Sequence, residues 1–210
     1  SVSQTGREAT GASTYTGSLG ADTFIMAATA DVIDGAAGGD TLDINFAAIL
    51  GGMNVDLSSS TNQIVSMNGS GISGTVTNME SVLLDGYTGS FGAQVTGSTA
   101  ANTIIGTANV DSLSGGTGAD TITGGDGADT INLGSDTDVD VYRLNTQADG
   151  GALGEDETTG ADTITNFDQG EDNVGISVAL ENSLTNGDAN STLDVSTFTT
   201  NNLNKNTTDS

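Results

Sequence analysis

Acidic residues recur at a fixed interval in this 210-residue chain, and their side chains suit the binding of a hard cation. Asp111, Asp120 and Asp129 are spaced nine residues apart. Calcium prefers oxygen ligands, which it takes from carboxylates and backbone carbonyls. The spacing therefore predicts a row of calcium ligands. The residues of this register that we predict as metal ligands are Asp22, Asp31, Asp40, Asn102, Asp111, Asp120, Asp129 and Asp138.

The ligand positions belong to nine-residue units, which occur in two blocks. Residues 17–43 contain the units GSLGADTFI, MAATADVID and GAAGGDTLD. Residues 97–141 contain GSTAANTII, GTANVDSLS, GGTGADTIT, GGDGADTIN and LGSDTDVDV. An apolar residue occupies the eighth position of each unit until the last, where Asp140 breaks the pattern. The apolar residues are Phe24, Ile33, Leu42, Ile104, Leu113, Ile122 and Ile131.

Each unit predicts a turn followed by a short strand. Six Gly-rich residues form the turn, because Gly accepts positive φ and close backbone approach. Three residues form a strand whose central side chain points inward. Two units then complete a coil of 18 residues, so equivalent turns stack. We expect Asp111 over Asp129, Asp120 over Asp138, Asn102 beside Asp120 and Asp22 over Asp40, with Leu113 on Ile131 and Ile104 on Ile122 inside.

Stacked carboxylates need a counter-charge. Like charges at a strand spacing of about 4.8 Å repel each other. A calcium ion between the turns reverses that sign, whereas magnesium fits less well because it demands a rigid octahedron. Asp and Asn in turns also cap nearby backbone groups. This alternative stays open, most of all for Asn102 and Asp31, and we expect Asp126 and Asp136 to be solvated.

Two tandem units, 115–123 and 124–132, match G-G-x-G-x-D-x-U-x at every fixed position. The chain thus resembles the RTX (repeats-in-toxin) family. The resemblance implies an all-β fold, a right-handed parallel β-roll or β-solenoid, with calcium between successive turns. It also implies export by type I secretion to the bacterial cell surface or beyond. Residues 77–82 and 162–172 resemble segments that flank such repeats. The glycines whose turns are expected to offer carbonyl ligands are Gly115, Gly116, Gly118, Gly124, Gly125 and Gly127.

Composition excludes several classes of function. The chain has 28 acidic and 3 basic residues, a formal charge of −25, and no Cys or His. A zinc site of the usual type, a thiol nucleophile and a Ser-His-Asp triad are therefore excluded. Binding to nucleic acid or to an anionic membrane surface is disfavoured by the charge. No apolar run is long enough for a membrane-spanning helix.

The chain divides into six predicted segments. Between the two repeat blocks we expect wider β-coils, in preference to a ligand- or partner-binding insertion. The segments are 1–16, an N-terminal arm or linker; 17–43, the first repeat block; 44–96, the wider coils; 97–144, the main β-roll; 145–178, an acidic loop and C-terminal cap; and 179–210, a polar tail that the resemblance makes a candidate export signal.

The sequence allows three functions to be considered for this chain. The first is a non-catalytic, calcium-dependent extracellular structural protein that self-associates into a surface layer, sheath or filament. The second is the calcium-binding and secretion module of a larger secreted enzyme, toxin or adhesin. The third, a polysaccharide-cleaving enzyme with a carboxylate pair, is disfavoured because calcium binding already explains the acidic register.

Overall fold

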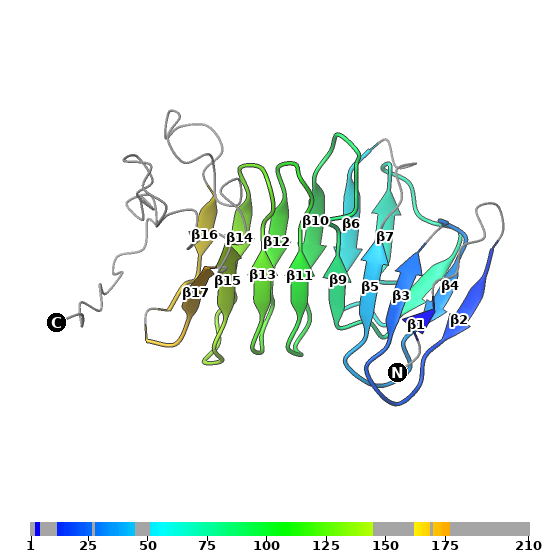
Figure 1. Ribbon diagram of the computed structural model, residues 1–210, viewed down its shortest axis with the longest axis horizontal. Helices are drawn as coiled ribbons and strands as arrows, with labels where there is room; N and C mark the ends of the chain where they lie inside the picture. Colours follow the sequence, from blue (N-terminus) through cyan, green and yellow to red (C-terminus); the bar gives the residue numbers. More distant parts are fainter. Residues whose placement is uncertain are drawn as a thin grey trace, which may run out of the picture.

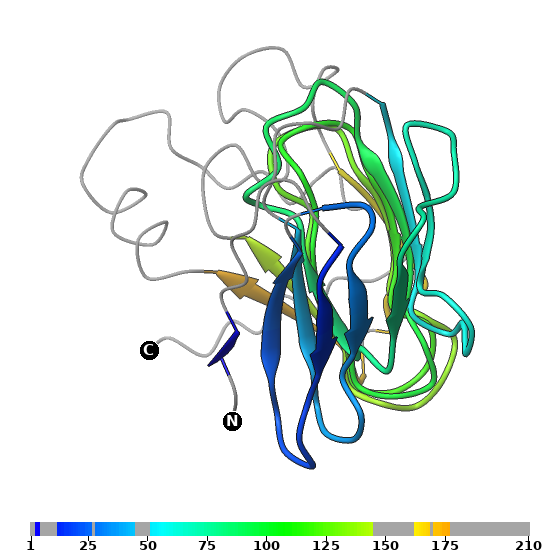
Figure 2. The same cartoon turned by 90° about the vertical axis from the view of Figure 1, so that its right-hand side faces the viewer.

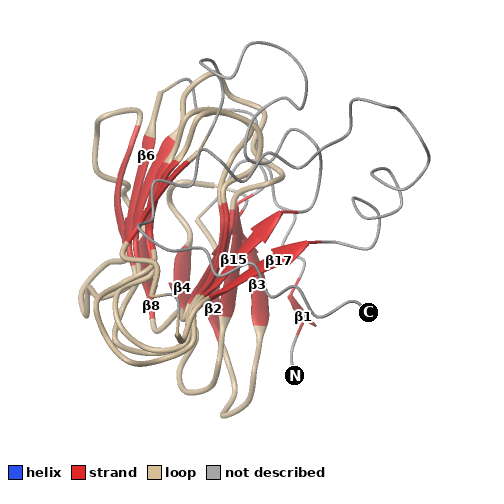
Figure 3. Cartoon of the chain, turned by 90° about the vertical axis from the view of Figure 1, so that its left-hand side faces the viewer, coloured by secondary structure: helices blue, strands red, loops and turns tan. Residues whose placement is uncertain are grey.

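The protein is a stack of short parallel strands (Figure 1). The computed structural model describes residues 3–4, 12–26, 28–44, 51–144, 162–168 and 170–176. These ranges contain strands and turns but no helix. Views along the stack show strands on the walls of the cross-section, with the turns gathered between them (Figures 2 and 3). The predicted all-β parallel roll is confirmed.

The largest sheet runs along the stack and has eight strands. All of its neighbouring pairs are parallel. In spatial order the strands are β1 (Ser3–Gln4), β3 (Thr23–Met26), β5 (Thr41–Ile44), β9 (Ser81–Leu83), β11 (Thr103–Ile105), β13 (Thr121–Thr123), β15 (Val141–Leu144) and β17 (Asn173–Ile176).

Two smaller sheets supply the other strands of the coils. The strands β6 and β7 pair antiparallel, and the other strand pairs of these two sheets are parallel. The six-stranded sheet has the order β16 (Thr163–Thr165), β14 (Thr130–Asn132), β12 (Ser112–Ser114), β10 (Ala93–Thr96), β6 (Met53–Asp56) and β7 (Ile64–Met67), and the three-stranded sheet has the order β2 (Thr14–Thr16), β4 (Val32–Asp34) and β8 (Thr75–Thr77).

Most repeat coils contain the expected 18 residues. Thr103 pairs with Thr121, and Ser112 pairs with Thr130. In the first block, Thr23 pairs with Thr41 at the same separation. Stacking in register at this interval is what the nonapeptide count predicts.

One coil is longer, and it overturns a predicted contact. Thr121 of β13 pairs with Val141 of β15, 20 residues away. Turn 133–140 thus holds two more residues than the six-residue turns of the preceding units. Asp140, not Asp138, immediately precedes the strand, so the predicted stacking of Asp120 on Asp138 is wrong. The same shift explains why Asp140 stands at the apolar position of the nine-residue register, because Tyr142 takes the inward position two residues later.

The core lies between the walls of the roll. Ile104 and Ile122 are paired neighbours, as are Leu113 and Ile131, and all four are at most 1% exposed. Burial of each such side chain stabilises the fold by roughly 1.5–3 kcal/mol. The predicted inward residues are confirmed as core: Phe24, Ile33, Leu42, Ile104, Leu113, Ile122 and Ile131.

Residues 51–96 supply coils of the same solenoid together with a hairpin. β6 pairs in parallel with β10, while β7 folds back against β6. Gln63 anchors this hairpin from a buried position. Its Nε2 donates to the carbonyl oxygens of Leu57 and Met79 at 2.8 and 2.9 Å, and its Oε1 accepts from the Met79 N–H at 2.9 Å.

The two ends of the roll also contain strands. Thr14–Thr16, within the predicted N-terminal arm, is strand β2, and β1 pairs with β3. At the other end β16 and β17 add a further coil onto β14 and β15. Residues 145–161 and 177–210, which include most of the acidic loop and the polar tail, lie outside the described residues. Within the described ranges, no helix is long and apolar enough to cross a bilayer.

Candidate calcium sites in the stacked turns

Acidic or amide residues stand immediately before the strands of the eight-stranded sheet. Each occupies the last position of a turn, so the stacking of the strands brings these side chains into a row. We call this row the first ladder. Its members, one before each strand from β3 to β17, are Asp22, Asp40, Glu80, Asn102, Asp120, Asp140 and Asp172.

Hydrogen bonds join successive members of the first ladder. The N–H of Asp22 donates to Oδ1 of Asp40 at 2.8 Å, and the N–H of Asp40 donates to Oε2 of Glu80 at 2.7 Å. Further along, the N–H of Asn102 donates to Oδ1 of Asp120 at 2.7 Å. In each of these pairs an oxygen of the later side chain holds its coil on the previous one, whereas between Glu80 and Asn102 the Asn102 amide donates to the Glu80 carbonyl oxygen. The ladder continues from Asp120 to Asp140 at 2.8 Å and from Asp140 to Asp172 at 3.0 Å.

A second ladder precedes the strands of the six-stranded sheet. It consists of Asp111, Asp129 and Asp162. The N–H of Asp111 donates to Oδ1 of Asp129, and the N–H of Asp129 donates to Oδ1 of Asp162, both at 2.8 Å. Asp31 holds the corresponding position before β4, where its Oδ1 accepts from the Ser13 N–H at 3.1 Å.

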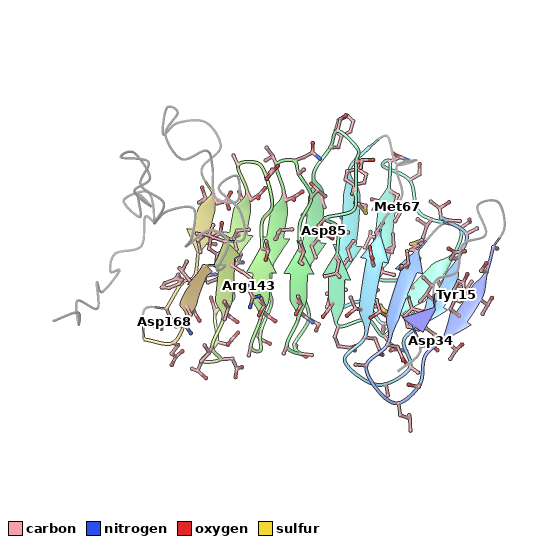
Figure 4. The ribbon with its side chains drawn as sticks, viewed as in Figure 1. Tyr15, Asp34, Met67, Asp85, Arg143 and Asp168 are labelled. Carbon is pink, nitrogen blue, oxygen red and sulfur yellow. The ribbon has the colours of Figure 1, made fainter. Side chains whose placement is uncertain are left out.

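The predicted stacking of Asp111 on Asp129, Asp22 on Asp40 and Asn102 beside Asp120 is thus confirmed. Asp138, in contrast, is exposed in turn 133–140, where its N–H donates to Asp136. Asp126 is exposed as expected, but Oδ2 of Asp136 is buried. Whether the individual side chains and glycine carbonyls bind calcium stays a prediction. Figure 4 labels Asp34, at the end of β4, and Asp168, after β16, towards opposite ends of the stack.

The ladder carboxylates are buried at a high electrostatic cost. Asp120 is 1% exposed, and burial, followed by the charge of Asp140, raises its pKa to about 7 against an opposing hydrogen bond from Asn102. Burial is also the main cause that raises the pKa of Asp40, Asp111, Asp140 and Glu80. Arg143 is the one basic residue in the described ranges, and it is exposed. A cation between the turns would offset this cost.

Two carboxylates of the first ladder each keep an oxygen that no group in the described ranges satisfies. Oδ2 of Asp40 and Oδ2 of Asp120 are buried without a hydrogen-bond partner. A buried unpaired carboxylate oxygen is costly, and it is a suitable ligand for a hard cation. This donor chemistry fits calcium.

Backbone oxygens surround the same space. A Cβ placed on Gly115 would contact Oδ2 of Asp120 and lie 2.8 Å from the carbonyl oxygen of Leu133. Gly124 borders the carboxylate of Asp129 in the same way. The first glycine of each exact repeat therefore leaves room beside the carboxylate. Within the described ranges no cluster of three or more acidic side chains could hold a metal ion, so carbonyl oxygens would complete the coordination.

The exact repeats also need glycine for their backbone shape. Gly116 and Gly118 have φ values of +103° and +100°, in the region that side chains other than glycine rarely adopt. Gly125 and Gly127 repeat this shape at +99° and +130°. The two turns share the spacing G-G-x-G, which therefore encodes one backbone path.

Sequence counting missed four ladder members. These members fall outside the nine-residue register because segments of other lengths precede them. They are Glu80, Asp140, Asp162 and Asp172. A shorter signal marks them, because each stands two residues before an inward apolar side chain. These side chains are Tyr142, Ile164, Val174 and Val82.

A parallel β-roll with buried carboxylate ladders in its turns defines a class of cation-binding solenoid. The family comparison agrees: the model of the RTX calcium-binding nonapeptide repeat matches in four copies, at residues 10–42, 96–131 and 105–140. These segments, which cover less than half of the chain, match the RTX calcium-binding repeat, as the tandem motif predicted. Comparison with curated proteins gives no match.

Proposed function

We propose that this protein is a non-catalytic, extracellular structural protein whose β-roll folds on binding calcium and then self-associates. The observation that carries the calcium part is the buried, unpartnered Oδ2 of Asp120 within a ladder of stacked carboxylates. Calcium at extracellular concentration exceeds the roughly 10⁻⁴–10⁻³ M dissociation constants of extracellular calcium modules. Folding would therefore be driven outside the cell and not inside it.

Charge supports the same switch. The formal charge is −25, and a compact body with that charge repels itself. Without calcium, repulsion among the ladder carboxylates favours the extended chain. An extended chain is also what passes through a secretion channel, which agrees with the type I export typical of RTX proteins.

Self-association is supported by the edges of the roll. β16 and β17 end their sheets, and no described strand pairs with their outer edges. A parallel edge of this kind offers unpaired N–H and C=O groups to a neighbouring copy. Solenoids need capping residues at such ends, and a second copy can take that role.

A calcium titration of the full 210-residue chain tests both parts. We expect circular dichroism to change from coil to strand as calcium is added, and light scattering and electron microscopy to show particles larger than a monomer. An unchanged dichroism spectrum at millimolar calcium would refute calcium-dependent folding. A folded species that stays monomeric would refute self-association alone.

The second candidate is a non-catalytic calcium-binding and secretion module of a larger secreted enzyme, toxin or adhesin. The recognised repeats favour it as well, because the same repeats serve both roles. The length of the encoded gene product discriminates between the two. A large catalytic or adhesive domain on the same gene product would favour the module.

A further inference from the structure

The turns of the roll are of two kinds. We propose that the second residue of a six-residue turn decides whether that turn takes calcium: Ser or Thr closes the turn without an ion, whereas a residue with positive φ, which is Gly116, Gly125 or Ala36, leaves it open for one. This inference rests on the calcium binding proposed above and assigns the ions to particular turns.

In a closed turn the carboxylate is satisfied from within the turn. The N–H and Oγ of Ser18 donate to Oδ2 of Asp22 at 2.6 and 2.9 Å. In turn 106–111, the N–H of Thr107 donates to Oδ2 of Asp111 at 2.6 Å, and its Oγ1 donates to Oδ1 at 2.9 Å. Hydrogen bonds to an ionised carboxylate are among the strong ones. These two carboxylates have the donors that an open turn lacks.

Turn 97–102 is closed in a second way. The N–H of Ser98 donates to Oδ1 of Asn102 at 2.6 Å. The Nδ2 of Asn102 donates to the carbonyl oxygen of Glu80 at 2.6 Å. The neutral amide of Asn102 has no charge to attract calcium. Its N–H group also occupies the carbonyl oxygen of Glu80, which could otherwise serve as a ligand.

In an open turn the second residue cannot donate a side-chain hydrogen bond to the carboxylate, because its backbone has a positive φ. Gly116 has φ +103°, and a Cβ there would collide with the carbonyl oxygen of Ser98 in the preceding coil. No serine fits on this backbone. The buried Oδ2 of Asp120 is left without a hydrogen-bond partner, beside the Leu133 carbonyl oxygen. An ion bound here would provide the missing contact.

Turn 35–40 has the same open state in the first block. Ala36, its second residue, has φ +72°, and Oδ2 of Asp40 is buried without a partner. A left-handed conformation is unfavourable for a residue other than glycine. The structure therefore assigns calcium to the turns that end at Asp40 and Asp120. Turn 124–129 shares the backbone path of 115–120 and belongs to the same class, whereas the turns ending at Asp22, Asn102 and Asp111 take none.

The chain itself provides the matched test. Turn 115–120 is GGTGAD, and the turn stacked directly on it, 97–102, is GSTAAN. The double variant Gly116→Ser/Gly118→Ala converts the open turn to GSTAAD. We expect this full-length variant to lose at least one bound calcium ion in isothermal titration calorimetry, while circular dichroism in calcium retains the strand signal. The control is Thr117→Ala, which changes the residue between the two substituted positions. We expect it to bind as many calcium ions as the unmodified protein.

Two further variants keep the proposal testable if the first does not fold. Asn102→Asp places a carboxylate in a closed turn, and we expect no additional ion. Thr107→Gly/Asn109→Gly changes turn 106–111 to GGAGVD, and we expect one additional ion. An additional calcium ion bound by the Asn102→Asp protein would overturn the proposal. An unchanged number of calcium ions in a folded Gly116→Ser/Gly118→Ala protein would overturn it too. A parent chain that binds no calcium would instead refute the proposed function.

Discussion

The backbone N–H of Asp120 donates a 2.8 Å hydrogen bond to Oδ1 of Asp140, 20 residues further along the chain. The expected partner, Asp138, is exposed in the same turn. A ladder position is thus defined by the strand that follows it and not by its count from the previous aspartate. Asp140 therefore holds two coils together, whereas Asp138 faces solvent.

Asp140→Ala should therefore destabilise the roll, whereas Asp138→Ala should not. Loss of Asp140 leaves the buried Asp120 N–H without its acceptor, which costs about 1–3 kcal/mol. Loss of Asp138 should change the free energy of unfolding by about 0.5 kcal/mol or less. Urea unfolding of both variants in saturating calcium measures the difference. Equal losses would show that both acids belong to the ladder.

The calcium-free protein should become more stable as the pH falls from about 7 towards 4. Burial raises the pKa of Asp120 from 3.8 to about 7, so in this window the folded chain binds more protons than the unfolded chain. Protonation then favours folding, and stability is lost as the pH rises through 7. Burial shifts Asp40 and Asp140 in the same direction.

Circular dichroism of calcium-depleted protein between pH 8 and pH 5 checks this expectation, because the folded fraction should rise as the pH falls. Asp120→Asn, which cannot titrate, should show a smaller dependence on pH than the parent. At saturating calcium the trend should weaken, because calcium binding needs the ionised carboxylate. A calcium-free protein that gains stability as the pH rises would contradict the assigned pKa shifts.

Gln63→Leu should destabilise the hairpin of β6 and β7 even when calcium is saturating. The substitution leaves the Met79 N–H and the carbonyl oxygens of Leu57 and Met79 without their side-chain partner, and each such buried group costs about 1–3 kcal/mol. Gln94→Leu, on an exposed position of β10, is the matched control and should be close to neutral. Chemical denaturation in millimolar calcium distinguishes the two.

Ile122→Ala should remove about 2–5 kcal/mol from the free energy of unfolding. Ile122 is fully buried between Ile104 and Tyr142 of the adjoining strands, so the truncation leaves a cavity. Val110→Ala tests the opposite case, because Val110 is 65% exposed at the tip of a turn. We expect its unfolding midpoint to match that of the parent, and a comparable loss in both variants would place Val110 in a packed environment.

The sequence alone determined the coil and much of the site. Its nine-residue period places Asp111 over Asp129 and Ile104 beside Ile122, because turn and strand lengths are local properties that repeat without reference to the rest of the chain. The tandem motif at 115–132 also predicted the match to the RTX calcium-binding repeat.

Only the tertiary structure decided which acids join the ladders and which turns are open. Asp140, Asp162 and Glu80 follow turns or loops of irregular length, so only strand pairing brings them into register. The difference between Asp111 and Asp120 depends on the backbone φ of the turn and on the carbonyl groups of the adjacent coil. The Thr107–Asp111 contact is local. The carbonyl oxygen of Ser98, which excludes a side chain at Gly116, and that of Leu133, beside Asp120, lie on adjacent coils, so only the stacked structure shows them.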